Sequence, residues 1–258
     1  MKHRFPIRAA AFGLAVCLLT GLCACTGRRD PSDTGTVTAG EEDSFLIDVT
    51  PYEEAINTDN SGYLVLVNKE HPVSSAFAPR DLTTMDPSLA LYGKEIQMEA
   101  AAALAAEALI RELWAHGWTD VFITSGYRTY EYQNTLFNKY IADERVSHPA
   151  WSAARAEEEV LTYSARPGTS EHQTGLGMDL IIADLHPALD ESFASHPCYA
   201  WLVENAHRFG FILRFPKGKE SVTGYSYEPW HYRFVGREAA TAIHEAGLTL
   251  EEYLAQTE

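Results

Sequence analysis

Cysteine is scarce in this chain of 258 residues, which contains four. Cys17 and Cys23 lie in an apolar N-terminal segment, Cys25 follows that segment directly, and Cys198 stands alone in the rest of the sequence. If the N-terminal segment is removed and Cys25 is modified, as argued below, no internal disulfide is possible. A structural zinc site built from several cysteines is excluded as well. We expect Cys198 to be a small buried apolar residue.

Basic residues are also few. The chain has 20 Lys and Arg against 36 Asp and Glu, which gives a formal net charge of −16. Affinity for nucleic acid depends on clustered Lys and Arg, so no nucleic-acid partner is expected. We interpret the acidic residues as a solvated surface that favours solubility. The sequence has no internal repeat that would indicate a repeat architecture.

Long hydrophobic runs are confined to the N-terminus. The mostly apolar residues 9–22 follow Lys2, Arg4 and Arg8 and are too short for an ordinary membrane span, which predicts a signal peptide over residues 1–24. Residues 22–25, Leu-Cys-Ala-Cys, resemble a bacterial lipobox, in which Cys25 would be lipidated and become the N-terminus. Because Cys23 is less usual than a small residue at the second position, cleavage at an ordinary signal-peptidase site remains the alternative.

The sequence therefore predicts an extracytoplasmic lipoprotein anchored to the bacterial cell membrane through a lipid on Cys25. Each buried lipid methylene contributes roughly 0.8 kcal/mol to membrane binding, so two or three acyl chains would hold the protein firmly at the membrane. Residues 25–60 are rich in Thr, Gly, Asp and Glu and read as a flexible linker. Residues 61–258 are long enough for a single folded domain.

Two short segments carry most of the chemistry. Residues 170–179, Ser-Glu-His-Gln-Thr-Gly-Leu-Gly-Met-Asp, contain His172 and Asp179, and residues 228–231, Glu-Pro-Trp-His, contain Glu228 and His231. A catalytic zinc takes three nitrogen or oxygen ligands and keeps a fourth position for water, and His172, Asp179 and His231 fit those three roles. Glu228 precedes the last ligand by three residues, where a general base for the water is needed. This set predicts hydrolysis.

A purely structural role for these residues is the alternative. A single histidine beside a Gly-rich turn is more often hydrogen-bonded than metal-bound. Asp179, however, lies in the run Met-Asp-Leu-Ile-Ile, which reads as a buried strand, and a charge there is costly unless it is paired or binds metal. The combination favours the metal site.

Two other enzyme motifs are incomplete or missing. His244 and Glu245 begin like a zincin motif, but Leu248 stands where its second histidine belongs. No Ser-x-x-Lys sequence occurs, which argues against serine acylation. The remaining histidines have no partner spacing that indicates a site, and we expect structural roles for His71, His116, His148, His186, His196 and His207.

The chain resembles the zinc D-Ala-D-Ala carboxypeptidases of the VanY type and the related L,D-carboxypeptidases, which trim bacterial peptidoglycan stem peptides. The resemblance runs from about residue 63 to about residue 236. Its matching segments are Ser-Gly-Tyr-Arg at 125–128, Pro-Gly-Thr-Ser-Glu-His-Gln-Thr-Gly at 167–175 and Glu-Pro-Trp-His-Tyr-Arg at 228–233. Gly177 differs from the alanine that family members often carry.

The resemblance implies roles for further residues. Arg128 would stabilise an oxyanion or hold the terminal carboxylate of the substrate, and Ser170 and Gln133 would line the substrate pocket. The structural alternatives are a surface salt bridge for Arg128, a turn hydroxyl for Ser170 and a solvent-facing amide for Gln133. One zinc ion per chain is the implied cofactor, and peptidoglycan stem peptides are the implied partners.

The order of apolar patterns favours an α+β fold, with a small antiparallel sheet and helices that flank it. The family implies the same architecture, with the sheet bearing the zinc site on its exposed face. We expect strands near residues 63–67, 121–124, 178–182, 211–215 and 230–235, and helices near residues 95–116, 149–163, 197–208, 237–246 and 249–256, with a further helix capped by Thr129.

Two alternatives to D-Ala-D-Ala carboxypeptidase activity remain. An L,D-carboxypeptidase would remove the D-alanine of a tetrapeptide stem, and only the shape of the pocket separates that activity from the first. A non-catalytic zinc-bearing lipoprotein that binds cell-wall peptides is the other alternative. The presence of both Glu228 and Arg128 argues against it.

Overall fold

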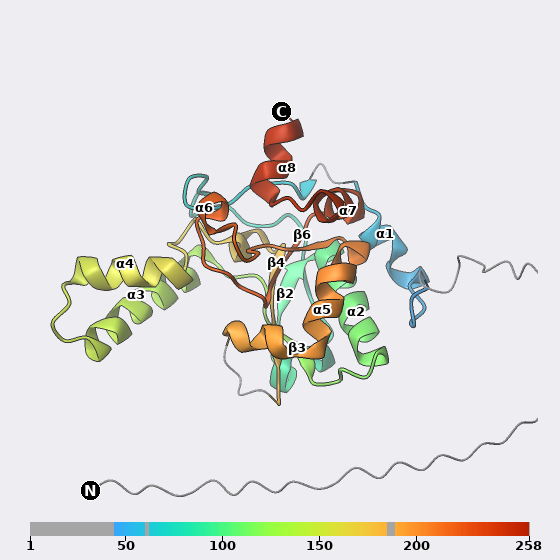
Figure 1. Ribbon diagram of the computed structural model, residues 1–258, viewed down its shortest axis with the longest axis horizontal. Coiled ribbons are helices and arrows are strands. Elements are labelled where there is room, and N and C mark those ends of the chain that lie inside the picture. Colours follow the sequence, from blue (N-terminus) through green and yellow to red (C-terminus); the bar gives the residue numbers. More distant parts are fainter. Residues whose placement is uncertain (1–43, 60–61, 185–188, 258) are drawn as a thin grey trace, which may run out of the picture. The chain divides into compact units, whose positions relative to one another are not determined.

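The computed structural model describes residues 44–59, 62–184 and 189–257 (Figure 1). The predicted signal peptide, Cys25 and the first part of the predicted linker lie outside these residues. Within the described part of the chain, no helix is long and apolar enough to cross a membrane.

A four-stranded antiparallel sheet forms the centre of the fold, in the order β3-β4-β6-β5. Its strands are β3 (Val121–Ser125), β4 (Gly177–Ile182), β5 (Phe211–Leu213) and β6 (His231–Phe234). A two-stranded antiparallel sheet pairs β1 (Leu82–Thr84) with β2 (Gln97–Glu99). These small antiparallel sheets, combined with helices, confirm the expected α+β class.

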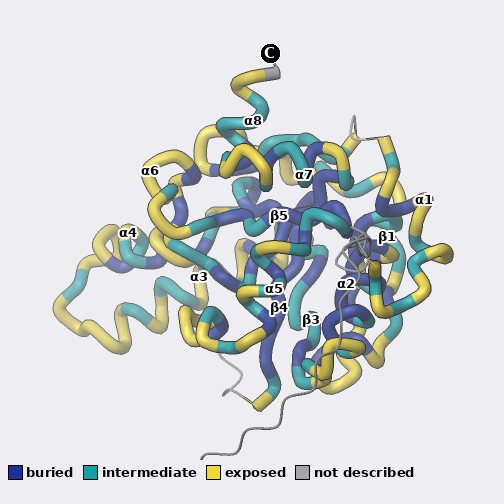
Figure 2. Tube along the Cα trace, turned by 45° about the vertical axis from the view of Figure 1, so that its right-hand side comes forward, coloured by how far each residue is buried: buried dark blue, intermediate teal, exposed yellow. Residues whose placement is uncertain are grey.

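The main hydrophobic core lies between the central sheet and α2 (Ala100–Ala115). Met178 and Leu180 of β4 and Tyr232 of β6 belong to this core, whereas Asp179 and His231 alternate with them and face the other side of the sheet. Figure 2 shows the strands as a buried centre. The sheet therefore separates the core from the predicted metal ligands.

The other helices surround this centre. α3 (Tyr130–Ser147) and α4 (Ala153–Tyr163) pack against each other as a helical hairpin at one side of the domain (Figure 1). The remaining α-helices are α1 (Glu53–Ile56), α5 (Pro197–Asn205), α6 (Glu220–Thr223), α7 (Arg237–Ala246) and α8 (Leu250–Thr257). Cys198 at the start of α5 is buried, as expected, and burial raises the pKa of its thiol to about 12.

Side chains cap two of the helices, one of them through Thr129, as the sequence predicts. The Thr129 hydroxyl accepts a hydrogen bond from Tyr132 N at 3.0 Å at the start of α3. Before α8, Thr249 N donates to the Glu252 carboxylate at 2.8 Å, and Glu252 N donates to the Thr249 hydroxyl at 3.2 Å. This reciprocal pair is a capping box, which satisfies two backbone donors at once.

The prediction of a strand at residues 63–67 is wrong. The segment is extended but pairs with no strand among the described residues, because a side chain occupies its carbonyl groups. Arg233 Nη2 donates to Tyr63 O at 2.8 Å and to Val65 O at 2.7 Å. The helix predicted from residue 95 begins too early, because Gln97–Glu99 form β2 and the helix starts at Ala100.

The predicted flexible linker ends earlier than residue 60. Leu46 N and Ile47 N donate to the buried Glu112 carboxylate at 2.9 and 3.0 Å, and Phe45 contacts Phe209 at 4.9 Å between ring centroids. The carboxylate satisfies backbone donors that a strand partner would otherwise satisfy. Residues 44–59 are therefore part of the folded domain, and the linker prediction is wrong for them.

Candidate metal centre

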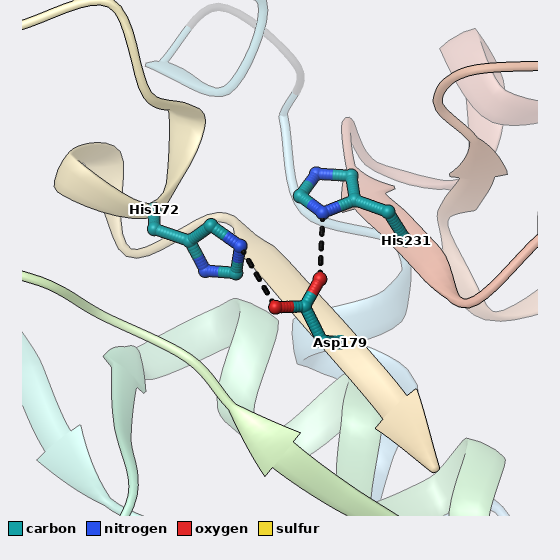
Figure 3. A group of neighbouring side chains, drawn as sticks. All are labelled: His172, Asp179 and His231. Carbon is teal, nitrogen blue, oxygen red and sulfur yellow. Dashed lines mark hydrogen bonds and ion pairs between the residues drawn. The ribbon is translucent and has the colours of Figure 1, made fainter. Parts of the chain in front are cut away.

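Two of the three predicted ligands lie on neighbouring strands. Asp179 of β4 and His231 of β6 are directly opposite each other in the antiparallel register, which brings their side chains together on one face. His231 Nδ1 lies 2.8 Å from Asp179 Oδ1. Both side chains are buried. Figure 3 shows them converging over β4.

The third predicted ligand, His172, comes from the 3-10 helix η5 (Glu171–Thr174), which ends at Gly175 in the left-handed region with φ 69°. Its Nδ1 lies 2.7 Å from Gly126 O, and because a carbonyl only accepts, Nδ1 carries the hydrogen. Nε2 then presents its lone pair and lies 3.2 Å from Asp179 Oδ2 (Figure 3). The backbone carbonyl that follows β3 thus fixes the direction in which His172 points.

The three side chains suit a metal ion. One possible ligand atom from each of His172, Asp179 and His231 lies within 4.8 Å of the others. Burial and the Arg128 guanidinium lower the pKa of His172 to about 4, so the ring is neutral. Burial also lowers the pKa of His231, but the hydrogen bond to Asp179 and the nearby Glu171 carboxylate outweigh it and raise the pKa to about 9. The carboxylates around His231 therefore favour a positive charge at this position, which a metal cation would supply.

Glu228 lies at the edge of this group and outside it. Its Oε2 is 3.9 Å from His231 Nδ1, and its side chain is largely buried. Burial raises its pKa to about 7, against the opposing effect of His231 and with support from Asp179. A carboxyl group with a pKa near neutrality exchanges protons readily in both directions.

Arg128 follows β3 and lies close to Asp179. Its Nη2 is 3.7 Å from Asp179 Oδ2, and its Nη1 donates to Gln133 Oε1 at 3.1 Å. Gln133 in turn donates to Ala165 O at 2.8 Å. Its side chain is buried and orients Arg128, so the alternative of a solvent-facing amide is wrong. Arg128 Nε is buried without a hydrogen-bond partner in the described structure.

Two clefts meet at this group of residues. The first has a volume of about 360 Å³ and is lined by Ser170, Gln133, Tyr225 and Glu228, among others. The second has a volume of about 640 Å³ and passes Lys94 and Tyr127. Both clefts are bordered by Arg128, Tyr140, Asp179 and Leu189. All the site residues that the sequence predicts in the folded domain therefore surround one opening.

A cluster of buried charged groups behind the site was not predicted from the sequence. Glu171 accepts from Arg214 Nε and from Arg233 Nη1, each at 2.7 Å, and all three side chains are buried. Glu251 of α8 accepts two hydrogen bonds from Arg214, from Nη1 at 2.9 Å and from Nη2 at 2.6 Å. The sequence signal that could have indicated this cluster is Glu171, a charged residue directly before the predicted ligand His172.

Gly126 is expected to tolerate no side chain. A Cβ there would lie 2.5 Å from Gln97 O and 2.7 Å from Ile96 Cγ2, and Gly126 O is the acceptor that holds His172. We expect Gly126→Ala to lower the free energy of unfolding by about 1–3 kcal/mol, as overpacking does. Denaturant unfolding checks this, with Gly62→Ala as control because its Cβ meets open space. Equal stability of the two variants would contradict the predicted clash.

Comparison with protein families gives a match over most of the folded domain. The model described as "VanY: D-alanyl-D-alanine carboxypeptidase" matches residues 95–237. The chain is 39% identical to the putative carboxypeptidase YodJ of Bacillus subtilis over 194 residues, which cover 74% of this chain and 66% of YodJ. It is also 39% identical to a D-alanyl-D-alanine carboxypeptidase of Enterococcus faecalis over 191 residues, 74% and 65% of the two chains. The chain thus spans slightly less than two thirds of the length of each of these relatives.

Solved structures with the same fold include zinc and peptide complexes. VanYB in complex with D-alanine-D-alanine is 36% identical, with a TM-score of 0.63, over 76% of this chain and 99% of that one. A glutamate-to-alanine mutant of the D,D-pentapeptidase VanY in complex with Zn(II) is 35% identical, with a TM-score of 0.62, over 75% and 99%. The L,D-carboxypeptidase LdcB is 34% identical, with a TM-score of 0.64, over 74% and 84%.

Proposed function

Because the chain belongs to the VanY family of D-alanyl-D-alanine carboxypeptidases, we propose that it is a zinc-dependent carboxypeptidase that removes C-terminal D-alanine from peptidoglycan stem peptides. One observation carries this proposal. The ligand atoms of His172, Asp179 and His231 converge within 4.8 Å at the meeting point of two clefts, with a carboxylate beside them. That arrangement suits hydrolysis of a peptide that lies in the clefts.

Zinc is the cofactor, and we propose that His172 Nε2, Asp179 and His231 Nδ1 hold it. The donor set of two imidazoles and one carboxylate matches catalytic zinc, which keeps a fourth position for water. When bound, zinc lowers the pKa of a water molecule and polarises the scissile carbonyl.

Glu228 is the proposed general base and acid. Its carboxylate takes a proton from the attacking water and delivers it to the amine of the departing D-alanine. A pKa near 7 suits both steps, because the same group must accept the proton and then release it. The 3.9 Å between its Oε2 and His231 Nδ1 supports this role.

Arg128 is proposed to bind the negative charge of the substrate or of the tetrahedral intermediate. Its buried, unpartnered Nε and its position beside Asp179 support this role. Gln133 keeps the guanidinium in place through the 3.1 Å hydrogen bond, which refines its predicted role as a pocket residue. Ser170, buried at the wall of the first cleft, is positioned to contact the peptide.

Removal of D-alanine from a tetrapeptide stem is the second candidate. The similarity to the L,D-carboxypeptidase LdcB is close to that to VanYB, which favours neither. Incubation with stem peptides that end in D-Ala-D-Ala and in a single D-Ala, followed by mass spectrometry, tests both. We expect loss of one D-alanine from the first peptide. Loss from the second alone would support the L,D activity, and no loss from either by zinc-loaded protein would contradict the proposal.

We propose that the catalytic domain is held at the bacterial membrane by a lipid on Cys25, outside the cytoplasm. The lipobox-like residues 22–25 and the preceding apolar segment support this. In a bacterial host, the full-length protein is expected to incorporate labelled fatty acid and to sediment with membranes, and Cys25→Ala is expected to do neither. Lipid label on the Cys25→Ala protein would contradict the proposal.

A further inference from the structure

The buried charges behind the metal centre have no part in the mechanism above. Glu171 Oε1 accepts from both Arg214 and Arg233, whose side chains are fully buried. Burying charges is costly, and a hydrophobic replacement of such a cluster is often equally stable. The cluster therefore calls for an explanation other than fold stability.

The second carboxylate oxygen of Glu171, Oε2, faces the proposed metal ligand His231. Oε2 lies 3.6 Å from His231 Nε2, and neither atom has a hydrogen-bond partner in the part of the chain that is described. The separation exceeds a hydrogen bond, and a movement of about half an ångström brings the pair into range. A buried donor and a buried acceptor that face each other without other partners are complementary.

The two nitrogens of His231 then have separate tasks. Nδ1 faces Asp179 Oδ1 at 2.8 Å, on the side where the three ligand groups converge. If Nδ1 offers its lone pair to a metal, Nε2 must carry the hydrogen. His172 has the reverse arrangement, because its Nδ1 donates to Gly126 O and its Nε2 faces Asp179. Each imidazole therefore needs a hydrogen-bond acceptor for the nitrogen that does not face the metal.

The position of Glu171 is fixed from several elements. Arg233 lies two residues after His231 on β6, so both side chains lie on the same face of the strand. Arg214 follows β5 and is also held by Glu251 of α8 through two hydrogen bonds. The two arginines and two glutamates balance in charge. Because α8 lies beyond the residues 95–237 that match the family, this support reaches outside the matched segment.

We propose that Glu171 is a positioning residue that accepts the Nε2 hydrogen of His231 and so directs Nδ1 to the zinc, and that Arg214 links it to α8. A carboxylate in this place also raises the basicity of the imidazole. The inference rests on the proposed zinc site and is independent of which peptide is cleaved.

Nitrogen-15 NMR of the histidine side chains in the zinc-loaded wild-type protein tests the tautomer directly. The His231 signals are identified by their absence in His231→Ala. We expect a hydrogen on Nε2 of His231 and none on Nδ1. A hydrogen on Nδ1, with Nε2 bound to zinc, would overturn the proposal.

Chelator competition tests the effect on zinc. Glu171→Gln is expected to weaken zinc binding by about 10–100-fold, as loss of such a hydrogen-bond partner does. The control Glu157→Gln removes a carboxylate that is also paired with an arginine, Arg166, but on the surface, and should leave zinc affinity unchanged. Zinc affinity of folded Glu171→Gln equal to that of the control would refute the role. If Glu171→Gln does not fold, the tautomer of His231 in the wild-type protein alone decides whether the proposal stands.

These readouts separate the inference from the proposed function. Zinc affinity and the His231 tautomer do not depend on peptide cleavage. A protein that binds zinc with the expected tautomer but releases no D-alanine would contradict the proposed function and leave the role of Glu171 intact.

Discussion

Replacing Glu228 by glutamine is expected to reduce the rate of D-alanine release by about 10²–10⁴-fold while zinc content stays at the wild-type level. The amide cannot take a proton from water or deliver one to the leaving amine, and a positioned acid or base contributes a factor of this size. His172, Asp179 and His231 remain in place, so the metal is retained. The measurement is the initial rate of D-alanine release, with elemental analysis of the same sample.

Asp179→Asn provides the comparison for this variant. It alters a proposed ligand that lies 2.8 Å from His231, so its activity should fall through loss of zinc and recover in part when zinc is added in excess. Added zinc should restore nothing to Glu228→Gln. Turnover near the wild-type rate by zinc-loaded Glu228→Gln would remove this residue from the mechanism.

The double variant His172→Ala, His231→Ala is expected to purify without zinc and without detectable carboxypeptidase activity. It leaves Asp179 as the only one of the three converging groups, and one carboxylate does not hold zinc at a catalytic site. Zinc content by elemental analysis is the measurement, and the wild-type protein should carry about one zinc per chain.

The control replaces a histidine outside the site. His148 lies at the end of α3, where it is exposed and stacks on Trp151, so His148→Ala should keep both zinc and activity. Full zinc retention by the double variant would show that the metal, if present, binds elsewhere.

The strands and the converging ligands could be predicted because their signals are local. Asp179 is a charge inside an apolar run, and the spacing from Glu228 to His231 is short. The α+β class followed from the order of such segments and is confirmed. His231 lies 52 residues after Asp179, and grouping the two rested on the ligand chemistry of zinc and on the family resemblance.

The errors and omissions concern contacts between distant residues. The partners of Glu171 lie 43 and 62 residues away, and no periodicity in the sequence links them. The segment at 63–67 has the composition of a strand, but its carbonyls accept from Arg233, about 170 residues further along the chain. Residues 44–59 look like a linker because the buried Glu112 that holds them belongs to a helix much later in the sequence.

Zinc titration of the metal-free protein tests the central claim most directly. D-Alanine release from a peptide that ends in D-Ala-D-Ala is measured as zinc is added in known amounts. The account predicts no release without zinc, a rate that rises with each addition, and a plateau at about one zinc per chain. Release at the full rate from metal-free protein, or no release at one bound zinc per chain, would contradict it.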